Sequence, residues 1–299
     1  MIKKLEDILE KSKNLKKARL AVASAEDYEV LKAVKDAYEI GVIEPILVGD
    51  EKKIIEYAKE IGFDLENIRV ISSTSLKESA MVSVKLVSSD EADFVMKGLL
   101  DTAILLKEVL NKEYGLRKDS LLSHVMIYEV PNYHKLIMLT DGGMNINPDF
   151  EGKKKILKNS IETASVFGLD KIKVACLSAK EKVNEKMPST IDARKLQEFF
   201  EDEKDVIVEG PLAFDLAISN EASKIKNFKS EVSGDVDILL VPNIEMGNGI
   251  GKTLTYMANA KSAGVIMGAK KPVVLVSRAD THETKLYSIA LGALVANGQ

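Results

Sequence analysis

The sequence predicts an α/β protein made of two adjacent α/β/α domains, each a mostly parallel sheet with helices on both faces. Short runs of β-type residues alternate with helix-like segments over most of the chain, and this alternation is typical of parallel sheets. It is interrupted once, at 124–141, by a segment that reads as an antiparallel strand pair. We therefore expect a second domain to begin there.

The first part of the chain alternates regularly. A helix with mixed acidic and basic residues is expected within 1–17, and helix-like segments follow at 26–41 and 51–62. The β-type runs occur at 19–25, 44–50, 68–73 and 92–98. Because a helix-like segment separates successive runs, they predict one parallel sheet.

The second part resumes the alternation after the strand pair "HVMIYEVPNYHKLIMLTD". Helices are predicted at 151–168, 190–201, 213–223 and 253–263, and strands at 171–178, 206–210, 236–243, 263–269 and 271–277. The tail at 280–297 reads as an amphipathic closing helix. We predict one domain from 1–123 plus 270–299 and a second from 124–269, with a ligand-binding cleft between them.

The composition excludes several classes of protein. A net charge of −4 without a long basic run argues against nucleic acid as a partner. No apolar segment approaches the roughly 18 residues that span a bilayer, and the Lys-rich start is not a signal peptide, so we expect a cytoplasmic protein without a membrane partner. The single cysteine, Cys176, excludes an internal disulfide and is expected to be buried. His124, His134 and His282 lack ligand partners at helical or strand spacing, so we expect no metal site.

The stretch "EMGNGIGKTLTYM" at 245–257 resembles a phosphate-binding P-loop but has the wrong spacing. Met246 stands where the first glycine of G-x-x-x-x-G-K-[ST] belongs, and the glycines spell G-x-G-x-G rather than the dinucleotide pattern. We predict a glycine-rich turn before a helix, either as an anion cradle or simply to turn the chain. The polar candidates of this loop are Asn243, Asn248 and Lys252, and no ATP is implied.

Polar residues gather at the ends of predicted strands, where open α/β sheets carry their sites. Singly, each also has an ordinary interpretation as a cap or turn residue. Arg278 is the strongest candidate because a guanidinium binds a phosphate bidentately; the alternative for this residue is a surface ion pair with Glu283. Ser277 can donate a hydrogen bond to an oxyanion. The other candidates are Lys97, Gly98, Asp101 and Thr102; Asp141, Asn145, Asn147 and Pro148; and Gly210 and Pro211 in a loop, with Asp215 in the following helix.

Taken in order, the motifs "KGLLDT", "TDGGMNINPD", "EGPLAFDLA", "VPNIEMGNGIGKTL" and "VLVSRADTHETKLYS" resemble the phosphate acetyl/butyryltransferase family, most closely its phosphate butyryltransferase branch. The resemblance covers nearly the whole chain. It implies a fold similar to the isocitrate and isopropylmalate dehydrogenases and exchange of an acyl group between coenzyme A and inorganic phosphate. It further implies no tightly bound cofactor, a homo-oligomer, and metabolic coupling to an acyl-phosphate-consuming kinase.

The resemblance also implies residue roles. The family's catalytic Ser-Arg pair falls on Ser277 and Arg278, while the aspartate that activates the CoA thiol in the acetyl branch is replaced by Thr284. Asp280 and Glu283 are the candidate substitutes for that base. We expect direct attack in a ternary complex, because Ser277 has no visible base and Cys176 is expected to be buried. Lys97 is either a third donor or a surface lysine.

Three alternatives stay open at this point. The enzyme could prefer acetyl to butyryl groups, since one methylene changes binding by only about 1 kcal/mol. The substitution at Thr284 is compatible with a catalytically silent acyl-CoA-binding regulatory module. A metal- and NAD-dependent decarboxylating dehydrogenase would share the implied fold, but the strand ends supply no aspartate cluster for its metal.

Overall fold

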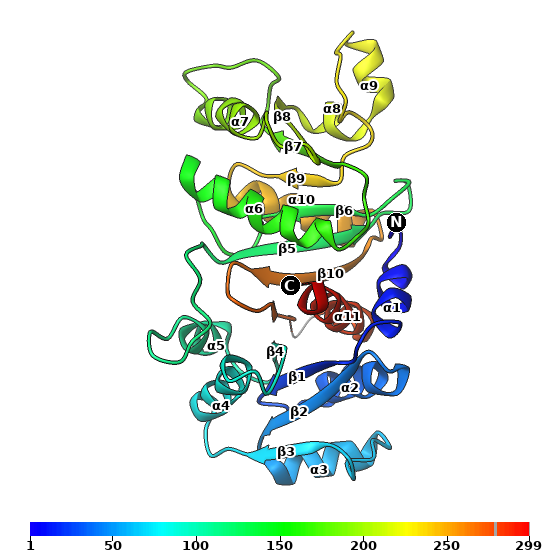
Figure 1. The fold of residues 1–299 in the computed structure, drawn as a ribbon. Coiled ribbons are helices and arrows are strands. Elements are labelled where there is room, and N and C mark those ends of the chain that lie inside the picture. The colour runs from blue at the N-terminus through cyan, green and yellow to red at the C-terminus, as the bar shows by residue number, and fades with distance from the viewer. Residues whose placement is uncertain (278–279, 299) are drawn as a thin grey trace. The chain divides into compact units, whose positions relative to one another are not determined.

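The structure, a computed structural model, describes residues 1–277 and 280–298 (Figure 1). The chain forms two compact units: unit 1 comprises Met1–Lys4 and Leu121–Lys261, and unit 2 comprises Leu5–Ser120 and Ser262–Gln299. The predicted boundary at 123/124 lies close to the observed one, whereas the predicted boundary at 269/270 places in the second domain a strand that belongs to unit 2. The division into two domains stays a prediction. No helix in the described part of the chain is long and apolar enough to cross a membrane.

Unit 2 contains a sheet with strand order β3-β2-β1-β4-β11-β10. The first five strands run parallel and β10 runs antiparallel to β11, so the alternation predicted for the first part of the chain is confirmed. The last two predicted strands form this antiparallel pair, and β11 is shorter than expected. The strands are β1 (Ala18–Ala23), β2 (Ile43–Gly49), β3 (Arg69–Ser72), β4 (Phe94–Lys97), β10 (Lys261–Met267) and β11 (Val273–Val274).

The helices of unit 2 form two groups, because β1 to β3 advance in one direction across the sheet and β4 returns to the other side of β1. A right-handed crossover then carries the intervening helix to the opposite face. α4 packs against β1 and α5, whereas α11 packs against α1, α2 and β1. The helices are α1 (Leu5–Lys13), α2 (Tyr28–Ile40), α3 (Glu51–Glu60), α4 (Leu76–Ser88), α5 (Thr102–Val109) and α11 (His282–Gly298).

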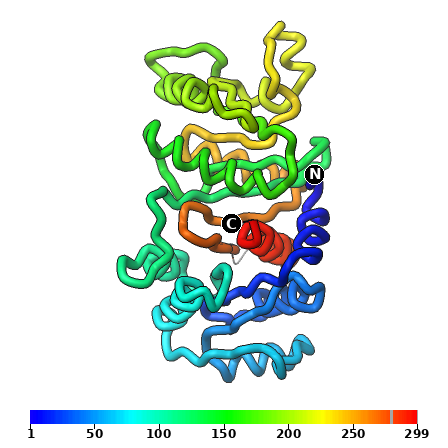
Figure 2. The backbone as a smooth tube through the Cα atoms, viewed as in Figure 1, coloured from blue at the N-terminus to red at the C-terminus, as the bar shows by residue number. Residues whose placement is uncertain are grey.

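The closing helix α11 differs from its prediction. It lies beside α1, which comes from the opposite end of the chain (Figure 2), and Ser12 Oγ donates to the carbonyl of Ala290 at 3.0 Å. Every residue from Tyr287 to Val295 is buried, so the amphipathic assignment is wrong. Gly292 allows α11 to pack closely against β4 and β11, since a Cβ there would lie 2.7 Å from side chains of Phe94 and Val274.

Unit 1 contains a sheet with strand order β5-β6-β9-β7-β8. β5 and β6 form the predicted antiparallel pair and the remaining neighbours are parallel. The strands are β5 (Ser123–Glu129), β6 (Ile137–Thr140), β7 (Ile172–Leu177), β8 (Val206–Leu212) and β9 (Ile238–Leu240). The helices are α6 (Phe150–Ser165), α7 (Pro188–Phe199), α8 (Phe214–Ile218), α9 (Asn220–Ile225) and α10 (Ile244–Met257).

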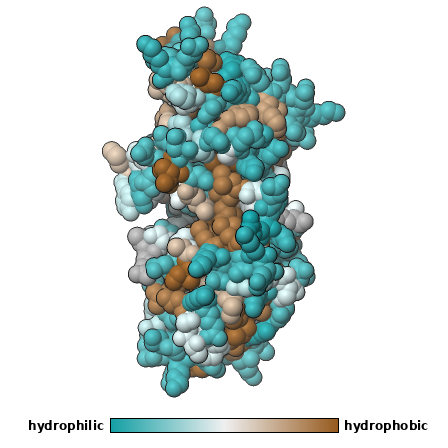
Figure 3. Space-filling view, turned by 90° about the vertical axis from the view of Figure 1, so that its left-hand side faces the viewer, coloured by the Kyte–Doolittle hydropathy of each residue, from teal (hydrophilic) through white to brown (hydrophobic). Residues whose placement is uncertain are grey.

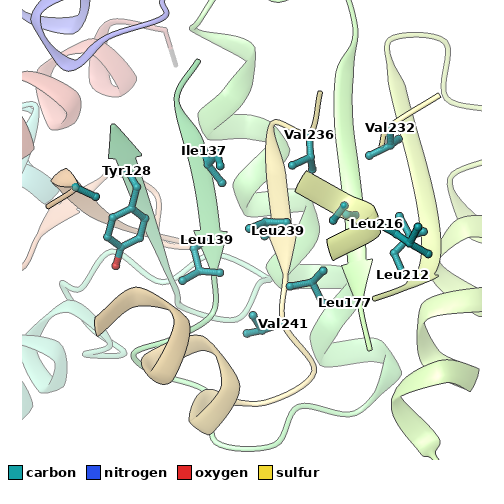
Figure 4. Packing of buried hydrophobic residues seen from close by; sticks show 13 residues of the cluster. Tyr128, Ile137, Leu139, Leu177, Leu212, Leu216, Val232, Val236, Leu239 and Val241 are labelled. Carbon is teal, nitrogen blue, oxygen red and sulfur yellow. The ribbon is translucent and has the colours of Figure 1, made fainter. Parts of the chain in front are cut away.

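One apolar cluster of unit 1 joins its sheet to α8 and α10 (Figure 4). Leu177 and Leu239 come from neighbouring strands, and Ile250 and Leu254 of α10 pack onto the cluster.

Apolar side chains also remain on the surface, and the face drawn in Figure 3 is mostly hydrophilic with separate hydrophobic patches. The most exposed large apolar residues of unit 1 are Ile146, Ile225, Tyr256 and Met257.

A network of charged side chains lies at the amino-terminal ends of the unit 1 strands. Lys135 Nζ lies 2.7 Å from Asp237 Oδ1 and 2.9 Å from Asp235 Oδ1, and Lys173 Nζ lies 2.6 Å from Asp235 Oδ2. Burial raises the pKa of Asp237 despite its bond to Lys135. Burial would also raise the pKa of Asp235, but hydrogen bonds from Lys173, Lys135 and His134 outweigh it and hold that pKa well below its ordinary value. The network has a structural role, far along the strands from their carboxyl ends.

Candidate active site

Lys97 is the last residue of β4 and is 7% exposed, so the interpretation as a surface lysine is wrong. Its Nζ donates to the carbonyls of Gly98 and Leu100, at 3.3 and 3.2 Å. A Cβ at Gly98 would lie 2.1 Å from the Ser24 carbonyl oxygen, which requires glycine at this contact with the end of β1. The predicted strand end is therefore a closely packed backbone turn that carries a buried ammonium group.

The segment after β11 leaves the sheet of unit 2 at the same edge. β11 and β4 are parallel with Val274 opposite Met96, so Lys97, which ends β4, and Ser277, which follows β11, lie at neighbouring strand ends. The N–H of Ser277 donates to Asp280 Oδ2 at 2.6 Å, and the N–H of Asp280 donates back to the Ser277 carbonyl at 3.1 Å. These two hydrogen bonds join Ser277 to Asp280, and Ser277 is exposed.

Arg278 lies outside the described residues. Its predicted phosphate contact and the alternative ion pair with Glu283 therefore stay predictions.

The start of α11 carries the two candidate bases. Thr284 Oγ1 accepts a hydrogen bond from Thr281 Oγ1 at 3.0 Å, so it serves the helix start. The Glu283 carboxylate accepts from the Tyr287 hydroxyl at 3.4 Å. Burial and the carboxylates of Glu283 and Glu6 raise the pKa of Tyr287, so this hydroxyl remains a donor.

Asp141 organises the loop that follows β6 in unit 1. Its carboxylate is 3% exposed and accepts from the N–H groups of Gly143, Met144 and Asn145 at 2.9, 3.0 and 3.3 Å. Asn145 Nδ2 adds a fourth bond at 2.5 Å and also donates to the Leu122 carbonyl at 2.9 Å. Four bonds occupy the lone pairs of a carboxylate, so Asp141 acts by holding the loop in shape.

The rest of this loop leads into α6 as predicted. Asn147 is exposed and Pro148 is half-buried beside it. Asp149 caps the helix by accepting from the N–H of Gly152 at 2.8 Å.

The glycine-rich stretch at 247–251 is helical, so the predicted loop is wrong. α10 begins directly after Asn243, whose side chain accepts from the N–H of Met246 at 3.0 Å. A Cβ at Gly247 would lie 2.6 Å from Gly142 Cα, and one at Gly251 would lie 2.6 Å from the Tyr128 hydroxyl. Two glycines four residues apart thus let one face of the helix touch the Asp141 loop and β5.

The polar candidates of this stretch point away from that contact. Asn248 and Lys252 are exposed on α10, and Lys252 Nζ lies 5.7 Å from the centre of the Tyr256 ring. The helix start offers few open donors, because the N–H of Ile244 bonds to the Ile146 carbonyl and that of Gly247 bonds to the Asn243 carbonyl. The predicted contact of Asn243, Asn248 and Lys252 with substrate stays a prediction.

Gly210 and Pro211 lie within β8 rather than in a loop, which corrects their placement. A Cβ at Gly210 would lie 2.7 Å from the Cβ of Cys176, and its N–H donates to Gln197 Oε1 at 3.0 Å. This glycine serves the packing of β8 against β7 and α7. Asp215 lies in the first turn of α8 as predicted, and a hydrogen bond from Lys226 lowers its pKa.

Cys176 is buried as expected, and burial raises its thiol pKa to about 12. Within the described ranges, no group of three or more His, Cys, Asp or Glu is placed to hold a metal ion. Sequence reasoning missed Gly142, whose contact with Gly247 fixes the loop, although the Gly-Gly pair after Asp141 was a usable signal. It also missed Ser24, which meets Gly98 from the end of β1 with a φ of 55°.

Comparison with known proteins decides the family. The phosphate acetyl/butaryl transferase model matches residues 4–85 and 71–293. The chain belongs to this family. Its relatives include the phosphate butyryltransferase of Clostridium acetobutylicum, 44% identical over 301 residues and 100% of both chains. The phosphate acetyltransferase of Thermotoga maritima is 40% identical over 98% of this chain and 99% of its own.

Solved structures of family members have the same fold. A branched-chain phosphotransacylase from Enterococcus faecalis superimposes with a TM-score of 0.83 and 36% identity, over 93% of this chain and 99% of its own. A 4-hydroxythreonine-4-phosphate dehydrogenase from Burkholderia phymatum, 15% identical with a TM-score of 0.57 over 93% and 98%, shares the fold alone. The predicted family and the predicted dehydrogenase-like fold class are confirmed.

Proposed function

We propose that this chain is a phosphate butyryltransferase, which converts butyryl-CoA and inorganic phosphate into butyryl phosphate and CoA. The observation that carries the proposal is the 44% identity over its full length with the butyryltransferase of Clostridium acetobutylicum. We infer that CoA and phosphate are its substrates and that no cofactor is tightly bound.

The proposed step is direct attack in a ternary complex. A phosphate oxygen forms a bond to the thioester carbon, an oxyanion develops on the carbonyl oxygen, and the C–S bond then breaks to release the CoA sulfur, which takes up a proton. Two negative centres must be stabilised together. We assign the phosphate to the Arg278 guanidinium and the oxyanion to the Ser277 hydroxyl. The hydrogen bond from the N–H of Ser277 to Asp280 supports the assignment, because it fixes the backbone of this exposed serine beyond the end of β11.

Lys97 is our candidate for a further cation at this edge. Its burial favours the role, since an ammonium group acts more strongly on an anion away from bulk water. It leaves β4 beside the strand that leads to Ser277. Its two carbonyl contacts hold Nζ against the turn at 98–100.

The reverse reaction requires a base for the CoA thiol, whose ordinary pKa is about 8.5. Thr284 cannot supply one, so we assign the role to Asp280 or Glu283. Asp280 lies directly beside Ser277, whereas Glu283 is hydrogen-bonded to Tyr287. A covalent acyl-enzyme is disfavoured because the Cys176 thiol is buried with a pKa of about 12.

We retain the unit 1 candidates as proposed substrate contacts. The exposure of Asn147 supports a direct contact, while the internal bonds of Asp141 and Asn145 support a positioning role for the loop. Gly210, Pro211, Asn243, Asn248 and Lys252 complete the proposed set. We also infer a cytoplasmic homo-oligomer coupled to an acyl-phosphate-consuming kinase.

The test is phosphate-dependent release of CoA from acetyl-, butyryl- and isobutyryl-CoA. We expect thiol release only with phosphate and the highest kcat/KM with butyryl-CoA. A preference for acetyl-CoA would make the protein a phosphate acetyltransferase, the alternative that its Thermotoga relative supports. Binding of all three esters without cleavage would identify a silent acyl-CoA-binding regulatory module.

A further inference from the structure

We propose that Lys153 and Asp192 are positioning residues for the acyl transfer, because their ion pair fixes the start of α6 and the Asp141 loop (residues 141–148) that leads into it. The inference rests on the proposed function and adds two residues that no motif of the sequence singled out. Lys153 lies in the first turn of α6 and Asp192 in the second turn of α7. Lys153 Nζ donates to Asp192 Oδ2 at 2.6 Å.

The pair is largely buried in apolar surroundings. Lys153 is 6% exposed, and the side chain of Asp192 is 20% exposed. Lys153 lines a small cavity whose other side chains are mostly apolar. They include Cys176 and Leu177 of β7, Leu240 of β9 and Leu196 of α7. An ammonium group in such surroundings is unfavourable unless it is paired, so the bond to Asp192 compensates for the burial of Lys153.

The two helices that the pair joins begin at the same edge of the unit 1 sheet. β6 and β7 both run parallel to β9, which lies between them. The chain leaves β6 through the Asp141 loop to enter α6, and it leaves β7 through residues 178–187 to enter α7. Because both right-handed crossovers advance in one direction across the sheet, α6 and α7 cover the same face, opposite α10 (Figure 1).

The Asp141 loop is attached closely to the first turn of α6. The Asp149 carbonyl accepts from the N–H of Lys153 at 2.8 Å. A Cβ at Gly152 would lie 3.1 Å from the Cβ of Pro148, so the end of the loop packs against the same turn. A shift of the start of α6 would therefore displace the loop and its proposed substrate contacts.

The loop is thus supported from both faces of the sheet. On the α10 side, a Cβ at Gly142 would lie 2.8 Å from the carbonyl carbon of Gly247. On the α6 side, the support is the bond between Lys153 and Asp192. A charge-assisted hydrogen bond is short and directional, whereas apolar contacts are non-directional. An apolar pair of similar volume would stabilise the fold as well, so the specific contribution of the ion pair is to fix position.

The experiment compares urea unfolding with phosphate-dependent release of CoA from butyryl-CoA. Lys153→Met and Asp192→Leu, each alone, should lower the urea midpoint and kcat/KM, because each leaves a charge without its partner. The double variant should regain the wild-type midpoint, since no unpaired charge remains. Its kcat/KM should stay at least about tenfold below wild type, because the loop is no longer held in place.

Lys135→Met is the matched control. It breaks the ion pair with Asp237, which is also buried in unit 1 but lies at the opposite edge of the sheet. The urea midpoint should fall while kcat/KM stays unchanged under conditions in which circular dichroism shows every variant to be folded. A loss of kcat/KM equal to that of Lys153→Met would overturn the proposal, because activity would then follow stability wherever the pair lies.

The double variant decides between position and stability. Recovery of both the midpoint and kcat/KM would overturn the proposal, and so would a midpoint that stays low, because the pair would then act as a stabilising contact alone. A wild type that releases no CoA with phosphate would instead overturn the proposed function, and this inference with it. An active wild type beside a stable double variant of low kcat/KM is the result that we expect.

Discussion

Replacing Gly247 with alanine should destabilise unit 1, whereas the same replacement at Gly249, two residues along the same helix, should stabilise it. Both changes gain about 1 kcal/mol of helix propensity. At Gly247 the new Cβ would lie 2.6 Å from Gly142 Cα and 2.9 Å from Val241 Cγ2, so backbone must move. At Gly249 it meets no atom within 4 Å.

Overpacking of this kind costs about 1–3 kcal/mol. We therefore expect Gly247→Ala to lose up to about 2 kcal/mol and Gly249→Ala to gain about 1 kcal/mol. Their difference, about 1–3 kcal/mol, measures the packing cost alone because the propensity terms cancel. Gly247→Ala should also lower kcat by displacing the loop that Asp141 holds.

The assay is urea unfolding of both variants and wild type at one fixed protein concentration, since association contributes to apparent stability. Equal free energies of unfolding for the two variants would refute the close contact between α10 and the Asp141 loop. A less stable Gly249→Ala would refute the open environment assigned to that residue.

Three further predictions concern buried and paired groups. Lys135→Met should lower the free energy of unfolding by about 3–5 kcal/mol, because it leaves the carboxylate of Asp237 buried without its charged partner. Urea unfolding measures this loss beside the surface control Lys32→Met, for which the loss should be smaller. The pKa of Asp235 is lower in the folded state than in the unfolded state, so this carboxylate stabilises the fold above about pH 4 and loses that effect as the pH falls. Asp235→Asn should therefore reduce the decrease in the free energy of unfolding between pH 6 and pH 3. An unchanged pH profile would contradict this prediction. The thiol of Cys176, with a pKa raised to about 12 by burial, should resist alkylation at pH 8 in native protein, and Cys176→Ala should keep full kcat.

The alternation of strands and helices was predictable because period-2 and period-3.6 patterns reflect burial within each segment. The strand pair around Pro131 and the strand end at Lys97 followed from the same patterns. Candidate site residues could be chosen at the ends of predicted strands, because parallel strands present their carboxyl ends at one edge of the sheet.

The failures arose where contacts distant in sequence outweigh local preference. Gly247 and Gly251 indicate a turn by themselves, but Gly142 and Tyr128 supply the surface against which a glycine helix packs. For α11 the sequence pattern predicted an amphipathic helix. Lys285 is buried and donates to the Asp280 carbonyl at 2.5 Å, and Ser288 Oγ donates to the Thr284 carbonyl at 2.7 Å. Because such polar side chains find hydrogen-bond partners within the chain, a buried helix can have the sequence pattern of an amphipathic one.

The roles of the two candidate bases are separable by pH dependence. In the direction that forms butyryl-CoA, the variant lacking the base should lose kcat most strongly near neutral pH and recover as the CoA thiol ionises toward pH 9. We expect this profile for Asp280→Asn and little change for Glu283→Gln. The reverse result would transfer the assignment to Glu283.

The most direct test of the central claim is phosphate-dependent release of CoA from butyryl-CoA by wild type and by Arg278→Ala. If Arg278 stabilises the charge that develops during attack by phosphate, kcat should fall by at least about 100-fold, the usual cost of removing one such donor, while circular dichroism and urea unfolding stay unchanged. A variant that releases CoA at the wild-type rate, or a wild type that binds butyryl-CoA and releases no thiol with phosphate, would contradict the assignment of this chain as a phosphate acyltransferase acting through Arg278.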